Sequence, residues 1–285
     1  MKLPFKIDLK GKTAVVTGGG GVLCSEFSKA IAACGANVAV CDLRLDAADK
    51  VADAIKADGG SAIAVEANVL DKKSLEAARD VILEKFGGID ILLNGAGGNN
   101  PKGTTSKEYF DPEDLSEEAK DIKTFFDLDP DGVSFVFNLN FLGTLLPTQV
   151  FAREMLKREK PVILNVSSMN AFRPLTKIPA YSGAKAAVSN FTQWLAVHFA
   201  KSGMRVNAIA PGFFITDQNR DLLLKPDGSL TPRSEKILNH TPMGRFGEVS
   251  DLIGAVLWLL DDKAAGFVTG VVVPIDGGFA AYSGV

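Results

Sequence analysis

The sequence predicts a Rossmann-like α/β fold: a single domain built on a doubly wound parallel sheet with helices on both faces. Short apolar runs alternate along the chain with stretches of helical periodicity, which is the pattern of repeated βαβ units. The apolar runs are rich in Val and Ile without strict polar alternation, as expected for strands covered on both faces. Four consecutive glycines, 18–21, separate the first strand from the first helix. No linker interrupts the sequence, so we expect one domain over residues 1–285.

The first half of the chain supplies four strands and three helices in regular alternation. The run 12–17 ends at the glycines, and helical periodicity follows it through Ala33. The remaining elements of this half follow in the order strand 37–42, helix 46–58, strand 61–66, helix 71–86 and strand 89–93. Each of the first three strands is therefore followed by an amphipathic helix that can cross back over the sheet.

The second half continues this pattern after one irregular segment. Strands are expected at 161–166, 204–209 and 270–274, and long helices at 132–157 and 179–202. The segment 98–131 is an insertion rich in Asp, Glu, Lys, Gly and Pro. It could be a solvated surface excursion. It could instead cover a ligand, because it leaves the carboxyl end of a central strand, where α/β sheets bind ligands.

Composition excludes several classes of protein. A net charge of -3 and a pI near 5.5 give no basic surface for phosphate backbones, so no nucleic-acid partner is expected. The longest uninterrupted apolar runs are about eight residues, against the ~20 that a membrane span needs. The N-terminal segment lacks the apolar core of a secretory signal, which predicts a cytoplasmic protein. The three cysteines lack metal-ligand spacing and are expected to be reduced, with no metal site.

The glycine cluster and Asp42 together indicate a dinucleotide site. Glycines permit a tight turn and close backbone approach, and the following helix directs free N–H groups at a pyrophosphate. The cluster alone is also consistent with a merely flexible turn. Asp42, however, ends the second strand, where a carboxylate can accept hydrogen bonds from the adenosine ribose. Such a carboxylate repels a 2′-phosphate and favours NAD over NADP, although Arg44 could weaken that preference.

Tyr181 and Lys185 form the candidate catalytic pair. Their i, i+4 spacing sets both side chains on one face of a helix. A nearby ammonium group and an oxidised nicotinamide would stabilise the phenolate and lower the tyrosine pKa. Ser168, thirteen residues upstream, could hydrogen-bond the substrate oxygen. A Tyr-x-x-x-Lys pair alone more often belongs to an ordinary surface helix, so the assignment depends on the rest of the pattern.

A series of ordered signals makes the sequence resemble the short-chain dehydrogenase/reductase family over nearly its whole length. They are the turn 17–21, Asp42, the segment 94–97, Asn140, the pair Ser167 and Ser168, the segment 181–185, Pro211 and Gly212 with Thr216, and the segment 276–278. The resemblance implies a catalytic tetrad of Asn140, Ser168, Tyr181 and Lys185. In it, Asn140 would help link Lys185 to solvent as a proton relay, and Lys185 would also bind the nicotinamide ribose.

The resemblance also implies which residues bind the cofactor. Besides Asp42, Tyr181 and Lys185, these are Gly18, Gly20, Gly21, Leu23, Asn68, Val69, Asn94, Ala96, Gly97, Pro211, Gly212, Phe214 and Thr216. Four positions depart from the family pattern. Val22 and Cys24 stand where glycines are usual, so the turn must take its unusual dihedrals from 18–21. Asn68 replaces an Asp beside the adenine, and Gly95 replaces a second Asn.

A narrower resemblance concerns the substrate. The run 168–174, the insertion and the segment 211–214 look like those of the D-mannonate oxidoreductases within this family, which are also called fructuronate reductases. This implies exchange of a hydride between nicotinamide and a sugar acid, D-mannonate or D-fructuronate. A sugar acid needs a cation and polar partners. Arg173 is the candidate for its carboxylate, with Asn170 and His240 as further contacts, although each is also consistent with a solvated or structural role.

Alternative functions remain open at this point. The protein could act on another polyol or sugar acid, like a gluconate 5-dehydrogenase, or be a 3-oxoacyl reductase, which Asp42 disfavours because those enzymes usually take NADP. A non-catalytic nucleotide-sensing protein of the same fold belongs to a different class, and the complete tetrad opposes it. The apolar helices 132–157 and 179–202 could pack against copies of themselves, and the resemblance implies a homotetramer.

Overall fold

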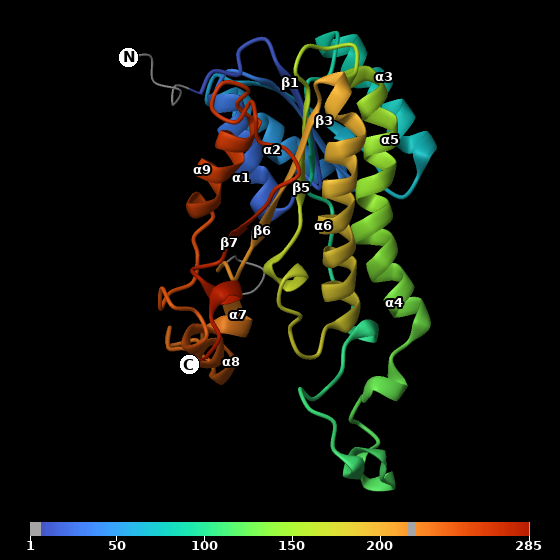
Figure 1. Ribbon diagram of the computed structural model, residues 1–285, viewed down its shortest axis with the longest axis vertical. Helices are drawn as coiled ribbons and strands as arrows, with labels where there is room; N and C mark the ends of the chain where they lie inside the picture. The colour runs from blue at the N-terminus through green and yellow to red at the C-terminus, as the bar shows by residue number, and fades with distance from the viewer. Residues whose placement is uncertain (1–6, 216–219, 285) are drawn as a thin grey trace.

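The computed structural model describes residues 7–215 and 220–284 and confirms the predicted fold class. Its seven strands form one parallel sheet in the order β3-β2-β1-β4-β5-β6-β7 (Figure 1). The strands are β1 (Thr13–Thr17), β2 (Asn37–Asp42), β3 (Ser61–Glu66), β4 (Ile91–Asn94), β5 (Val162–Val166), β6 (Arg205–Pro211) and β7 (Val272–Ile275).

Helices cover both faces of the sheet. They are α1 (Val22–Ala33), α2 (Leu45–Ala57), α3 (Lys72–Phe86), α4 (Pro130–Phe137), α5 (Gly143–Met155), α6 (Pro179–Phe199), α7 (Arg220–Leu223), α8 (Pro232–Asn239) and α9 (Ser250–Leu260). Helices α1, α2 and α9 lie on one face, and α3, α5 and α6 lie on the other (Figure 1).

Successive residues of one strand belong to different hydrophobic cores, because side chains alternate across a sheet. In β1, Val16 packs with Phe27 of α1 on one face. Its neighbour Val15 packs with Phe151 of α5 on the other. All five residues of β1 are buried, which explains why the sequence shows no polar alternation there.

The sheet order reverses between β1 and β4. The polypeptide passes outward from β1 to β3, then returns to the other side of β1 to lay down β4 to β7. Because α/β sheets bind ligands at such a switch point, the carboxyl ends of β1 and β4 are where a site is expected. The glycine turn, Asp42 and the segments after β4, β5 and β6 all lie at this edge.

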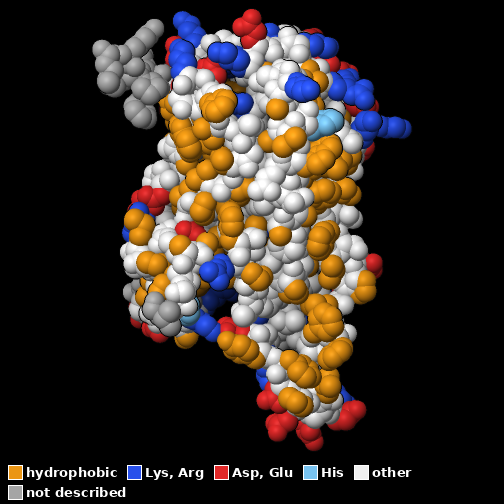
Figure 2. Space-filling view, viewed as in Figure 1, with side chains coloured by type: hydrophobic (Ala, Val, Ile, Leu, Met, Phe, Trp, Pro, Cys, Tyr) orange, Lys and Arg blue, Asp and Glu red, His pale blue; other side chains and the backbone are white. Residues whose placement is uncertain are grey.

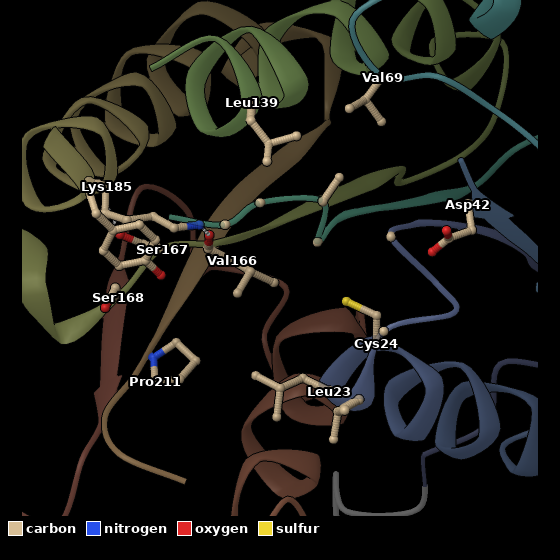
Figure 3. Close-up of a pocket in the computed structure, with 18 of the residues that line it drawn as sticks. Leu23, Cys24, Asp42, Val69, Leu139, Val166, Ser167, Ser168, Lys185 and Pro211 are labelled. Atoms are coloured by element: carbon tan, nitrogen blue, oxygen red, sulfur yellow. Dashed lines mark hydrogen bonds between the residues drawn. The ribbon is translucent and has the colours of Figure 1, made fainter. Parts of the chain in front are cut away.

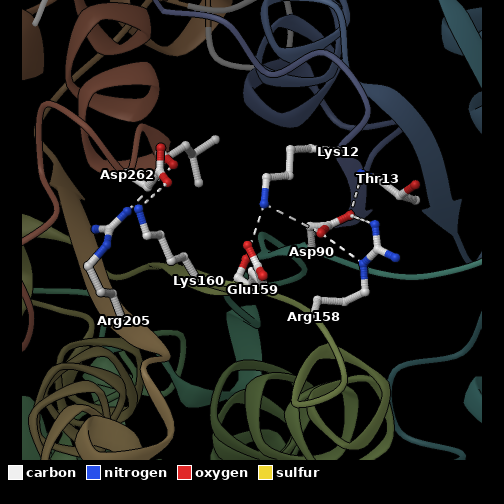
Figure 4. A network of polar contacts seen from close by, with 9 residues as sticks. Lys12, Thr13, Asp90, Arg158, Glu159, Lys160, Arg205 and Asp262 are labelled. Carbon is white, nitrogen blue, oxygen red and sulfur yellow. Dashed lines mark hydrogen bonds and ion pairs between the residues drawn. The ribbon is translucent and has the colours of Figure 1, made fainter.

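The opposite edge of the sheet is held by a buried carboxylate (Figure 4). Asp90, only 2% exposed, accepts hydrogen bonds from the Thr13 backbone N–H (2.9 Å) and from Arg158 Nε (3.0 Å). Lys12 Nζ lies 3.6 Å from the same carboxylate. The network therefore ties the start of β1 to the segment that follows α5.

Helices α4 and α5 are joined by a π-helical segment, Asn138–Leu142, into one helical run, which matches the long helix predicted at 132–157. Among the described residues, this run alone has the length and apolar composition that could cross a membrane. Half of its most apolar window is buried, however, and it packs against β4, α3 and α6. We interpret it as one of the helices that cover the sheet on the face of α3 and α6.

The segment 98–131 forms a compact extension rather than a strand or long helix. It contains four short 3-10 turns, η1 (Pro101–Gly103), η2 (Pro112–Leu115), η3 (Glu117–Ala119) and η4 (Phe125–Asp127). Its two arms are connected by the hydrogen bond from Ser106 N to Lys123 O (2.8 Å), and Lys102 pairs with Asp129 at its base (3.3 Å). It projects beyond the sheet at the carboxyl edge (Figure 1).

Candidate active site

A cavity of about 740 Å³ opens at the carboxyl edge of the sheet (Figure 3). Fourteen of the residues predicted from the sequence line it: Gly18, Gly21, Leu23, Asp42, Asn68, Val69, Ala96, Gly97, Ser168, Tyr181, Lys185, Pro211, Gly212 and Phe214. They come from the ends of β1 to β6 and from α1 and α6. One cavity thus brings together the predicted cofactor and catalytic residues.

The turn at residues 18–21 needs glycines because its backbone conformation and its close neighbours leave little room for side chains. Gly18 has φ +64°, in the left-handed region that favours glycine, and none of the next three residues does. A Cβ on Gly19 would lie 2.6 Å from Val40 Cγ1, and one on Gly20 would lie 2.6 Å from Ala47 Cβ. Val22 is the first residue of α1 and avoids positive φ, so this departure from the family pattern costs no strain.

The N-terminus of α1 offers donors to an anion. No side chain caps it, whereas Asp71 caps the N-terminus of α3. The first N–H groups of a helix have no partner within the helix, and together with the helix dipole they favour a phosphate. Leu23 in this first turn lines the cavity. The arrangement therefore fits a pyrophosphate, as the sequence predicts.

Asp42 is held by the backbone around it. Its Oδ2 accepts a hydrogen bond from Gly20 N (3.0 Å), and its Oδ1 accepts one from Arg44 N (3.0 Å). Gly20 itself does not line the cavity; it orients the carboxylate that does. Arg44 is exposed and forms no ion pair within the described residues. The Asp42 carboxylate, held in place by these two backbone hydrogen bonds, is therefore the charged group that faces the cavity at the end of β2.

Two departures from the family pattern compensate for each other. A Cβ on Gly95 would lie 2.1 Å from Cys24 Sγ, so the cysteine occupies the space that a side chain at position 95 would need. Cys24 is 5% exposed, and burial raises the pKa of its thiol to about 12. The thiol is therefore a packing group at neutral pH rather than a nucleophile.

Ser168, Tyr181 and Lys185 meet at one wall of the cavity. Lys185 Nζ donates to Val166 O (2.8 Å) and lies 5.6 Å from the centre of the Tyr181 ring. Burial lowers the pKa of Lys185 to about 8, which leaves it mostly protonated at neutral pH. Burial raises the pKa of Tyr181, and a hydrogen bond with Ser168 opposes that effect. In the protein alone the tyrosine pKa thus moves opposite to the direction expected from its lysine neighbour.

Asn140 lies behind this wall, in the π-helical segment. It is fully buried, and its Nδ2 donates to Gly98 O (2.7 Å) and Val136 O (2.8 Å). A π turn shifts the backbone hydrogen bonding by one residue, so the side-chain amide can reach a carbonyl of the preceding turn. Asn140 therefore joins the helix to the segment that follows β4.

Gly97 makes room for two of the predicted catalytic side chains. A Cβ at this position would lie 2.7 Å from Asn140 Oδ1 and 3.1 Å from Lys185 Nζ. Both polar groups therefore border the space beside Gly97, although they come from different helices. Only a residue without a side chain leaves this gap open.

The three predicted substrate residues do not line the cavity. Arg173 is exposed, and its Nε donates to Ala280 O in the C-terminal segment (3.1 Å). The His240 ring lies near Tyr282 of the same segment, with 6.3 Å between the ring centres. Asn170 is buried, and its side-chain oxygen has no hydrogen-bond partner among the described residues.

The insertion reaches the neighbourhood of the cavity through α8. Glu108 of the insertion forms an ion pair with Lys236 of α8, which lowers the pKa of that glutamate. Thr105 N also donates to Lys177 O, in the loop that follows Ser168 (2.9 Å). Figure 2 shows a hollow between the lobe of α7 and α8 and the insertion. These contacts attach the insertion to α8 and to the loop that follows Ser168, and none of residues 99–131 lines the cavity.

A further predicted residue, Asn94, lies outside the cavity lining. Asn94 is buried behind it, where its Nδ2 donates to Thr148 Oγ1 (3.0 Å) and Asn165 Oδ1 (2.9 Å). Thr216 lies outside the described residues.

Sequence reasoning missed several lining residues. Most of them adjoin motif residues: Val22, Cys24, Leu43, Ala67, Leu70, Gly95, Gly98, Val166, Ser167 and Phe213. Phe135 and Leu139 come instead from α4 and the π-helical segment. They are four residues apart, but no motif marks them.

The three cysteines are free thiols, as expected. In the part of the sequence that the structure describes, no group of three or more His, Cys, Asp or Glu side chains could hold a metal ion.

Comparisons with known proteins give the family. Residues 12–226 match the model of the short chain dehydrogenase family. An "uncharacterized oxidoreductase" of Haemophilus influenzae is 56% identical over 285 residues, covering 100% of this chain and 99% of that protein. The 7α-hydroxysteroid dehydrogenase of Escherichia coli is 32% identical over 271 residues, covering 95% and 94%.

A solved structure agrees with these matches. It is a candidate D-mannonate oxidoreductase of Haemophilus influenzae with bound NAD, 56% identical to this protein, with a TM-score of 0.93 and complete coverage of both chains. The family match extends over three quarters of the sequence and includes the glycine turn and the Ser168, Tyr181 and Lys185 positions. The chain belongs to the short-chain dehydrogenase/reductase family of oxidoreductases.

Proposed function

We propose that this protein is an NAD-dependent dehydrogenase that interconverts a secondary alcohol and a ketone on a sugar acid. The observation that carries the proposal is the meeting of Ser168, Tyr181 and Lys185 on one wall of the cavity that also holds the glycine turn and Asp42. A proton-transfer group and a dinucleotide site thus share one space.

The proposal that NAD is the cofactor rests on the match between its chemical groups and the residues at the cavity. The uncapped N-terminus of α1 suits a pyrophosphate, and the Asp42 carboxylate suits the adenosine ribose hydroxyls. The same carboxylate disfavours the 2′-phosphate of NADP. When bound, NAD⁺ supplies the hydride acceptor and a positive ring charge beside Tyr181, which would counter the effect of burial on the tyrosine pKa.

In the oxidation direction, we assign the proton transfer to Tyr181. Its phenolate oxygen takes the proton of the substrate hydroxyl as the carbon loses a hydride and the C=O bond forms. Ser168, which hydrogen-bonds the tyrosine, holds the substrate oxygen in line. The reverse reaction returns the proton from Tyr181 to the ketone oxygen.

Lys185 and Asn140 complete the proposed tetrad. The ammonium group stabilises the tyrosine phenolate, and its bond to Val166 O keeps the side chain extended along the cavity wall. The space beside Gly97, which both side chains border, lies on the path by which a proton could pass from Lys185 past Asn140. We propose that this gap is the proton outlet.

D-Mannonate and D-fructuronate are the proposed substrate pair. Support comes from the Haemophilus influenzae structure, which is similar over its whole length. The unpaired buried oxygen of Asn170 follows Ser168 closely and suits a substrate hydroxyl. Arg173 keeps its terminal guanidinium nitrogens free of ion pairs within the described residues, and we retain it as the candidate for the carboxylate. His240 contacts the same C-terminal segment as Arg173 and is retained as a further candidate.

The test is a screen of purified enzyme against aldonates and ketouronates with both nicotinamide cofactors, followed by nicotinamide absorbance. Turnover of D-mannonate or D-fructuronate with NAD supports the proposal. Turnover of another polyol alone would reject this substrate pair and keep the dehydrogenase assignment. The variant Tyr181→Phe should abolish turnover and leave NAD affinity nearly unchanged, because it removes the proton and preserves the shape. NAD binding without turnover of any substrate would support a nucleotide sensor instead.

We also propose that the protein is a cytoplasmic homotetramer. Helix α6 and the π-helical segment before α5 present apolar side chains at the surface, including Leu142 in that segment and Trp194 and Val197 on α6. Light scattering on the purified protein tests the assembly, and fractionation of cells tests the location.

A further inference from the structure

The insertion carries a group of exposed apolar side chains. Phe110 packs edge-to-face on Phe126, and Phe126 on Phe125, with ring centres 6.0 and 5.5 Å apart. These rings are 53% to 70% exposed, and Tyr109 beside them is 80% exposed. Aromatic side chains gathered at a surface in this way usually mark a binding face.

The same subunit cannot cover this group, because the insertion is fixed in place. Its arms are joined by the Ser106 and Lys123 hydrogen bond, and Lys102 and Asp129 pair at its base. The Glu108 and Lys236 ion pair holds it to α8. A segment with these attachments does not fold back over its own aromatic rings.

The apolar surface continues from the insertion along the helices. In Figure 2 a column of hydrophobic side chains runs over α6, α5 and α4 and onto the insertion. On α6, Phe191 stacks on Trp194, which is 55% exposed, and Val197 is 80% exposed. Phe141 contacts Phe191 from the neighbouring helix, with ring centres 5.4 Å apart. The insertion is therefore one end of a long apolar strip.

The two ends of this strip carry opposite charge. Residues 107–121 of the insertion contain seven acidic and two basic side chains. At the other end, Arg153 and Lys157 are exposed at the close of α5, and Lys201 follows α6. Figure 2 shows the acidic side chains below the strip and basic ones gathered above it.

A surface with this pattern is complementary to itself. A two-fold axis across the middle of the strip would lay the apolar parts together and set each acidic insertion against the basic ends of α5 and α6 in the other copy. A parallel arrangement would instead oppose acid to acid. We propose that the insertion is an assembly arm, and that its aromatic rings are covered by the basic end of the same helical face in a second copy of this protein.

The first test is assembly measured by analytical ultracentrifugation. The double variant Phe125→Ser with Phe126→Ser should weaken the assembly at least about 100-fold, because each pair of subunits loses four rings. Val81→Ser, which removes an exposed apolar side chain from α3, is the matched control and should leave it unchanged. Circular dichroism and NAD binding report whether each variant is folded. A monomeric wild type, or a folded double variant that assembles normally, overturns the proposal.

The second test addresses the orientation of the two copies. Glu117→Lys with Glu118→Lys should weaken the assembly, and adding Arg153→Glu with Lys157→Glu should restore it. Loss without restoration in a folded protein rejects the antiparallel arrangement. Neither test depends on the substrate, so failure of the assembly proposal leaves the proposed dehydrogenase activity intact. A protein that assembles as proposed but turns over no substrate would contradict the proposed activity and leave the assembly proposal intact.

Discussion

Replacement of Lys185 by Met should make the stability of the protein less dependent on pH. Burial lowers the pKa of this lysine from 10.5 to about 8 in the folded protein. The difference is about 2.5 pH units, and each unit corresponds to about 1.4 kcal/mol. The charged lysine therefore costs the folded state about 3 kcal/mol at neutral pH, relative to a lysine that remains in water.

The sign follows from proton uptake. Below about pH 8 the lysine is charged in both states, and the full cost is present. Between about pH 8 and pH 10.5 the folded protein holds it neutral while the unfolded state keeps it protonated, so unfolding takes up a proton. The free energy of unfolding therefore rises with pH over this window. Lys185→Met lacks this contribution.

Urea unfolding of both proteins, followed by tryptophan fluorescence, measures the effect from pH 7 to about pH 10.5. The wild-type free energy minus that of the variant should increase by about 3 kcal/mol over this range. Groups that do not interact with Lys185 titrate alike in both proteins and cancel in the difference. Lys50→Met, at an exposed position on α2, controls for the loss of one lysine. Protein concentration must be held fixed because assembly contributes to stability. Parallel curves for wild type and Lys185→Met would refute the reasoning.

Three further substitutions test other parts of the structure. Asp42→Ala should raise the NADP to NAD ratio of kcat/KM about tenfold or more, by removing a charge that repels the 2′-phosphate, and an unchanged ratio in steady-state assays would show that the carboxylate does not face the ribose. Gly97→Ala should lower kcat about 10- to 100-fold with the fold preserved in circular dichroism, because its Cβ would lie 2.7 Å from Asn140 Oδ1; full activity would contradict the tight gap. Asp90→Ala should lower the free energy of unfolding by about 3 kcal/mol, since it leaves the buried network with Arg158 unpaired, whereas a loss below about 0.5 kcal/mol would mean that the network contributes little.

The order of strands and helices could be predicted from the sequence because each element carries its own local pattern. Uninterrupted Val and Ile runs identify strands covered on both faces, and the glycine turn and Asp42 identify the cofactor edge. These features depend on neighbours along the sequence. The π-helical segment could not be predicted, since its backbone shift around Asn140 produces no change in apolar spacing.

The parts of the site that escaped prediction depend on contacts between distant segments. Phe135 and Leu139 line the cavity only because α4 packs beside α6. Burial raises the pKa of Tyr181 in the protein alone, and burial is a property of the packed structure that no local pattern indicates. The predicted lowering of this pKa includes the charge of the bound nicotinamide, so it stays a prediction. No local pattern indicates that Arg173 bonds to the C-terminal segment.

The contact between Cys24 and Gly95 constrains the route by which this protein could have left the common family pattern. With Asn still at position 95, a cysteine at 24 would collide with it, since even a Cβ there comes within 2.1 Å of the sulfur. With glycine already at 95, the same change only fills a void. The order with less strain is therefore glycine at 95 first and cysteine at 24 second, and a side chain restored at 95 alone would require the Cys24 sulfur to move. Ancestral sequences that are resurrected one position at a time should therefore have glycine at both 24 and 95 before they reach the present Cys24 and Gly95.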